Sequence, residues 1–180
     1  ALDVHVDPTG VIPGFFLQTA NSQKASMYGG ELEATVALSR DDRLSLTGTW
    51  LHARFDKFLL GGADLSGNQI QAAPDFTVQG SFEHTFHLAG GERLTAGVNS
   101  KWVAGHFVDN SNAPGSYQSS YTRTDANLTF ESADGRWQVS AFVKNIENHG
   151  IIMSFEQFGG FDAALLYAPR TFGGTLRYQY

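Results

Sequence analysis

The sequence predicts an all-β fold, an antiparallel up-and-down transmembrane β-barrel of which about eight strands are present. Stretches in which apolar and polar residues alternate recur along the chain, and this pattern indicates strands with two unlike faces. Most stretches are about 9–13 residues long, close to the length that crosses a bilayer at a tilt and longer than is usual in globular sheets. Short and long connections between them also alternate.

Each predicted strand has an apolar row and a polar row. In the second, Leu32 and Val36 lie opposite Glu31 and Glu33. No stretch has the periodicity of an amphipathic helix. The predicted strands are residues 11–18, 28–38, 44–56, 76–87, 94–106, 121–131, 136–146 and 170–180.

Three connections are tight turns rich in Asp, Gly and Ser, namely SRDDR, LAGGER and SADG. The others are long and cover residues 19–27, 57–75, 107–120 and 147–169. Membrane barrels have short turns at one end and long loops at the other, which gives this strict alternation. A soluble β-sandwich is the less favoured alternative, because its loop lengths are mixed.

Aromatic residues near the strand ends suit the two rims of a membrane band, where amphipathic rings meet the headgroups. A sandwich core is the other place for them, but the many charged residues on the polar rows disfavour it. The predicted outer rim holds Tyr28, Trp50, Trp102 and Tyr121, and the predicted inner rim holds Trp137, Tyr178 and Tyr180.

Composition and spacing exclude several functions. The net charge of −6 disfavours binding to nucleic acid, which is itself negatively charged. A chain without cysteine has no disulfide or Cys-ligated zinc. His84 and His87 lie on opposite faces of a strand, so they do not share a metal. Glu31 and Glu33 share a face but have no base or nucleophile placed beside them. Residues 109–112 have the composition of a turn and lack the spacing of a calcium loop. We therefore expect no enzyme, catalytic residue, metal or cofactor.

Four segments, taken in order, resemble the TonB-dependent outer-membrane receptors: YGGELEATVALSRDDRLSLTGTWLHARF, GNQIQAAPDFTVQGSFEH, WQVSAFVKNIENHG and PRTFGGTLRYQY. The resemblance covers about residues 28–180. It departs from the family pattern at Ile146 and Glu147, where Leu-Phe is usual, and at Tyr180, where Phe is usual. It implies that residues 1–180 are the C-terminal segment of a 22-stranded barrel. The plug domain and the TonB box would then lie outside these residues.

The resemblance implies a multi-pass protein of the Gram-negative outer membrane that imports a scarce nutrient such as a ferric siderophore. The implied partners are outer-membrane lipid, the rest of the barrel, the plug domain, the TonB complex acting through the plug, the assembly machinery and the siderophore. The assembly machinery would read the last strand through Leu176, Tyr178 and Tyr180. Candidate ligand contacts, each of which has loop packing or rim anchoring as its alternative role, are Tyr117, Tyr121, Arg123, Phe155, Phe158, Phe161 and Tyr167.

A second hypothesis is a self-contained small outer-membrane barrel with a structural or adhesive role. Eight strands close a barrel whose interior is just filled by side chains. A third hypothesis is a protease or acyl-transfer enzyme on a small barrel. It requires a Ser/His or Asp/His cluster, which the sequence does not assemble.

Overall fold

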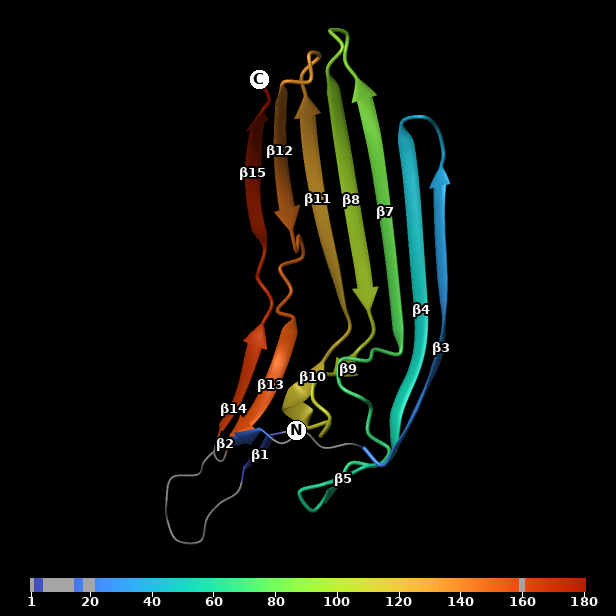
Figure 1. The fold of residues 1–180 in the computed structure, drawn as a ribbon, viewed down its shortest axis with the longest axis vertical. Coiled ribbons are helices and arrows are strands. Elements are labelled where there is room, and N and C mark those ends of the chain that lie inside the picture. The colour runs from blue at the N-terminus through green and yellow to red at the C-terminus, as the bar shows by residue number, and fades with distance from the viewer. Residues whose placement is uncertain (1, 5–14, 18–21, 159–160) are drawn as a thin grey trace.

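The computed structural model describes residues 2–4, 15–17, 22–158 and 161–180. Its main body is one antiparallel sheet of seven long strands (Figure 1). Each long strand pairs with the next one in the chain, as in an up-and-down barrel. The seven strands are β3 (Lys24–Ala37), β4 (Asp42–Lys57), β7 (Phe76–His87), β8 (Arg93–Val103), β11 (Tyr121–Glu131), β12 (Trp137–Lys144) and β15 (Thr171–Tyr178).

Short turns join these strands at one end of the sheet, the turn end, and long loops join them at the other, the loop end (Figure 1). In the β3–β4 turn, the Ser39 hydroxyl accepts hydrogen bonds from the backbone N–H groups of Asp41 and Asp42, both at 3.0 Å. In the other two turns Gly91 and Gly135 have φ of 93° and 68°. Glycine has no Cβ and therefore adopts positive φ without steric strain. The three tight turns are confirmed.

The sheet has one polar and one apolar face, as the alternation predicts. On the polar face, Gln79 of β7 lies between Thr47 of β4 and Lys101 of β8. The large side chains of the apolar face are exposed, with Leu32 at 67% and Leu176 at 65%. A soluble protein rarely leaves so wide an apolar surface open to water. This face is therefore suited to lipid.

Aromatic side chains gather at both ends of the apolar face. At the loop end the rings of Tyr28 and Trp50 are 6.0 Å apart, edge to face. At the turn end the rings of Trp137 and Tyr178 are 4.6 Å apart. These pairs occupy the two rims that the sequence predicts.

The placement of Tyr121 at the outer rim is wrong. Tyr121 pairs with Val103 and alternates in phase with Arg123, so it belongs to the polar face. Trp102 pairs with Thr122, one position along β11, and lies on the apolar face as predicted. The physical reason is the two-residue period of a strand, which outweighs the affinity of an aromatic ring for the rim.

The seven-stranded sheet is open. Within the described residues, β3 and β15 each have one neighbour and therefore present free edges, so these residues do not form a small closed barrel. Of the predicted strand 11–18, positions 11–14 and 18 lie outside the described residues. Its remainder, β2 (Phe15–Leu17), pairs with β1 (Leu2–Val4) in a separate two-stranded sheet.

The long loops contain short elements that the sequence pattern did not predict. Consecutive apolar residues, such as Ile151 to Met153, hide the two-residue period of the hairpin in the last loop. Four predicted strands end earlier than expected, namely β3 at Ala37, β8 at Val103, β12 at Lys144 and β15 at Tyr178. No helix in the described part of the chain has the length and apolar character needed to span a membrane. The short elements are β5 (Leu59–Leu60), β6 (Ala63–Asp64), β9 (His106–Phe107), η1 (Pro114–Ser116), β10 (Tyr117–Gln118), β13 (Ile152–Phe158) and β14 (Phe161–Leu166).

Candidate functional site

Three long loops meet at the loop end of the sheet. Loop A covers residues 58–75, loop B residues 104–120 and loop C residues 145–170. Loops carry binding residues more often than the scaffold that supports them. The contacts between these loops therefore define the candidate site.

Loops A and B are joined by two side-chain amides, Gln69, which is buried, and Asn112, which is half-buried. The Gln69 side chain, which is 7% exposed, donates to the Ala73 carbonyl at 2.8 Å and accepts from the Phe107 N–H at 3.1 Å. Asn112 accepts from the Gln69 N–H at 2.7 Å and donates to the Gln69 carbonyl at 2.9 Å. Buried polar groups that are fully paired in this way fix the two loops against each other.

The turn at residues 109–112 contacts loop A directly. The Asp109 carboxylate accepts from the Ser111 N–H at 2.8 Å, which confirms the turn chemistry predicted for this segment. The Asn110 side-chain oxygen accepts from the Gln71 N–H at 3.0 Å. This turn therefore also positions the GNQIQAAP segment.

Loop C docks on loop B through its hairpin. The Ile152 N–H donates to the Gln118 side chain at 2.8 Å. Phe155 is 6% exposed, and a Cβ built on Gly115 would lie 3.0 Å from its ring. The absence of a side chain at Gly115 leaves room for this aromatic ring.

Asn145 connects the end of β12 to loop C. It is 1% exposed, and its φ is 55°. Its side chain accepts from the His149 N–H at 3.1 Å and donates to the carbonyls of His149 and Ala168 at 3.0 and 3.4 Å. Its own N–H donates to the Asp125 carboxylate at 2.8 Å. Sequence reasoning did not single out this residue, although it lies in one of the four family-like segments.

Glu147 connects the start of loop C to β11 through hydrogen bonds. Its carboxylate accepts from the N–H and the hydroxyl of Thr124, at 2.8 and 2.5 Å. Desolvation raises the pKa of Glu147, but the hydrogen bonds from Thr124 outweigh it and the pKa is lower than is usual for glutamate. The carboxylate is therefore held in its charged form.

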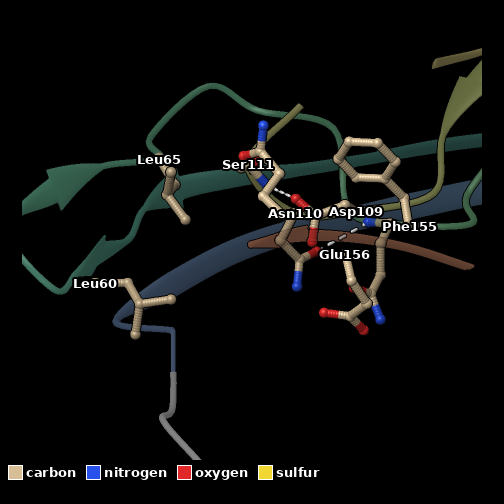
Figure 2. A pocket seen from close by; sticks show the side chains of 9 residues that line it. Leu60, Leu65, Asp109, Asn110, Ser111, Phe155 and Glu156 are labelled. Carbon is tan, nitrogen blue, oxygen red and sulfur yellow. Dashed lines mark hydrogen bonds between the residues drawn. The ribbon is translucent and has the colours of Figure 1, made fainter. Parts of the chain in front are cut away.

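A cavity of about 270 Å³ opens between the three loops (Figure 2); we call it the loop cavity. Carboxylates and amides lie beside leucine and phenylalanine side chains, so it can hold a ligand with both polar and apolar parts. In the described part of the chain, no group of three or more His, Cys, Asp or Glu residues has a geometry that could hold a metal. The lining residues are Leu60, Leu65, Gln71, Asp109, Asn110, Ser111, Phe155, Glu156 and Gln157.

Of the predicted ligand contacts, Phe155 lines this cavity. The Tyr117 ring packs against Phe107 with centroids 5.0 Å apart, which is the loop-packing alternative. The side chain of Phe158 lies outside the described residues, and Phe161 and Tyr167 are 65% and 49% exposed.

Two further predicted contacts, Tyr121 and Arg123, lie on the polar face of β11. The Arg123 guanidinium donates to both oxygens of Asp125 at 3.2 Å. The cavity therefore does not gather the whole predicted set. Sequence reasoning missed its polar lining as a ligand site, because the lining residues come from three separate loops.

Residues 3–146 match the family described as TonB dependent receptor-like, beta-barrel. This chain belongs to that family. It is therefore part of a β-barrel of the Gram-negative outer membrane, in a family of receptors and transporters and not of enzymes. Outer-membrane barrels have short periplasmic turns and long external loops. Loops A, B and C are thus external, the apolar face contacts lipid and the polar face lines the lumen.

Solved structures support the same fold. The ferric yersiniabactin uptake receptor FyuA from Yersinia pestis matches with a TM-score of 0.77 and 21% identity, over 87% of this chain and 24% of that one. The ferric preacinetobactin receptor BauA from Acinetobacter baumannii matches with a TM-score of 0.70 and 19% identity, over 98% and 25%. The siderophore receptor PiuA from the same organism matches with a TM-score of 0.64 and 16% identity, over 87% of this chain and 22% of that one.

The chain thus spans about a quarter of the length of each of these receptors. At these identities the likeness establishes the fold. No curated protein sequence matches the chain significantly.

Proposed function

We propose that this chain supplies barrel wall and external loops to an outer-membrane receptor that takes up a ferric siderophore, or a similarly scarce and bulky nutrient, with energy from the TonB complex. The observation that carries the proposal is the loop cavity, which lies at the external end of a receptor-type barrel wall. The names of the three similar structures, each a siderophore receptor, favour a ferric siderophore over other nutrients.

The proposed partners follow from the surfaces of the sheet. The free edges of β3 and β15 leave backbone groups unpaired, and neighbouring strands of a larger barrel would pair with them. The polar face suits a plug domain, through which the TonB complex would act. Residues 1–180 are then the C-terminal segment of the receptor barrel, with the plug domain and the TonB box outside them.

We also propose roles for the residues named from the sequence. Phe155 is the best supported ligand contact, because it lines the loop cavity, and Tyr121 and Arg123 would meet a ligand in the lumen. In β15, Leu176 and Tyr178 share the lipid face, and Tyr180 continues that row. These three residues would form the signal for the assembly machinery. The remaining ligand-contact proposals are Tyr117, Phe158, Phe161 and Tyr167.

Iron uptake tests the proposal. Iron-starved cells that produce the full-length receptor should accumulate radioactive iron from a ferric siderophore, and deletion of either the receptor or TonB should abolish the uptake. A receptor that lacks Tyr180 should reach the outer membrane in smaller amounts, measured by immunoblot of membrane fractions. Uptake that persists without TonB would contradict the transport proposal, and an unchanged amount of receptor would contradict the assembly proposal.

A further inference from the structure

We propose that the loop cavity selects ferric complexes whose net charge is zero or positive. The inference rests on the proposed uptake function and goes beyond it by naming the charge class of the ligand. Three features of the external end support it: the groups that line the cavity, the state of the nearby arginines and the overall charge of the loops.

The cavity presents carboxylates and no cation. Asp109 and Glu156 line it, and no lysine or arginine from the described part of the chain does. Within the described residues, Glu156 forms no side-chain hydrogen bond or ion pair, and Asp109 binds only the Ser111 N–H through its carboxylate. Both carboxylates therefore have oxygens available to accept from an ammonium, amide or hydroxyl group of a ligand.

Of the three arginines near the loop end, two are already engaged by carboxylates, whereas the side chain of Arg170 forms no ion pair or hydrogen bond within the described residues. Arg54 donates through Nη2 to both oxygens of Asp75 at 3.1 and 3.0 Å. Arg123 donates through Nε and Nη2 to the two oxygens of Asp125, both at 3.2 Å. Recognition of an anion by arginine uses the same planar fork of donors. An anionic ligand would have to displace a carboxylate to bind Arg54 or Arg123.

The three external loops are strongly acidic as a set. Their residues include six carboxylates and one cation, Arg170, so their formal charge is 1 − 6 = −5 with histidine neutral. A mouth lined by one sign of charge concentrates ligands of the opposite sign and repels those of the same sign. The six carboxylates are those of Asp64, Asp75, Asp109, Glu147, Glu156 and Asp162.

A matched series of ferric complexes tests the inference. The probes are ferrioxamine B, which carries a free ammonium group, its neutral N-acetyl form, its anionic N-succinyl form and an anionic ferric tris-catecholate. Uptake of radioactive iron is measured in cells whose only siderophore receptor is the full-length protein. We expect uptake from the cationic and neutral complexes, and a half-saturating concentration about tenfold higher or more for anionic ones.

A charge-matched pair of variants locates the selection. Asp109→Asn with Glu156→Gln should reduce the preference for the cationic over the anionic hydroxamate by about tenfold, since a charge-assisted contact is lost. The control, Glu92→Gln with Asp134→Asn, removes the same charge at the turn end and should leave the preference unchanged. The two double variants are first shown to be present in the outer membrane in equal amounts.

The outcomes separate the two proposals. Uptake from anionic complexes at equal or lower half-saturating concentrations overturns the charge selection but leaves the uptake function intact. An equal loss of preference in both double variants also overturns the role of the cavity. Uptake from none of the four complexes contradicts the siderophore proposal itself, and the inference fails with it.

Discussion

Replacing Gly29 with alanine is expected to destabilise the barrel by about 3 kcal/mol, because the backbone has no room for a side chain there. A Cβ built on Gly29 overlaps the carbonyl oxygen of Trp50 and lies 3.1 Å from the Cα of Leu51. Both are backbone atoms of β4, the strand paired with β3. Relief therefore requires the two strands to separate locally.

Its neighbour provides the control. A Cβ built on Gly30 has no other atom within 4 Å, so Gly30→Ala should be neutral or should stabilise β3 by about 0.5–1 kcal/mol. Unfolding of the full-length receptor in urea, followed by heat-modifiable migration on gels, measures both variants. Equal stability of the two alanine variants would contradict the close approach of the β4 backbone to Gly29.

Replacing Asn145 with alanine is expected to cost about 4–5 kcal/mol and to release loop C. The change removes the hydrogen bonds to His149 and Ala168, at about 1 kcal/mol each for buried groups. It also leaves an alanine at φ 55°, which costs about 1–2 kcal/mol more. The free energy of unfolding and the rate of proteolytic cleavage within loop C measure the two effects.

Asn145→Gly separates the two contributions. Glycine loses the same hydrogen bonds but adopts positive φ without strain, so it should be more stable than the alanine variant by about 1–2 kcal/mol. If the two variants unfold at the same urea concentration, backbone conformation is not part of the role of Asn145. If neither differs from the parent receptor, the buried hydrogen-bond network is not holding loop C.

The regular part of the fold is predictable because each long strand has lipid on one face and water on the other. Apolar and polar residues therefore alternate along its sequence. The bounds of β7 and β11 agree with the predicted residues 76–87 and 121–131. Tyr121 is the exception, because its residue type favours the rim whereas its phase with Arg123 places it on the polar face. The hairpin β13–β14 was missed because consecutive apolar residues carry no period of two.

The candidate site was less predictable, because three distant loops build it. Asp109 and Glu156 line one cavity although they are far apart in the sequence. The contacts that join the loops depend on asparagines at positive φ, Asn112 and Asn145, a conformation in which asparagine is enriched but which a single sequence does not reveal. The interpretation of residues 109–112 as turn chemistry is confirmed, yet it gave no sign of the cavity beside them.

The central claim is that one face of this sheet contacts lipid and the other lines the lumen, and site-directed spin labelling tests it most directly. Labelled cysteines are placed singly along β7 of the full-length receptor in lipid bilayers, and residues 1–180 contain no cysteine that would compete for the label. Molecular oxygen concentrates in lipid, so it should increase the spin relaxation rate of labels that face lipid more than that of labels that face the lumen. The lipid row is Val78, Gly80 and Phe82, and the lumen row is Thr77, Gln79 and Ser81.

The expected result is an oxygen accessibility that alternates with a period of two residues and is high at position 78 and low at position 79. Equal accessibility in both rows, or an alternation of the opposite phase, would contradict the assignment of the two faces.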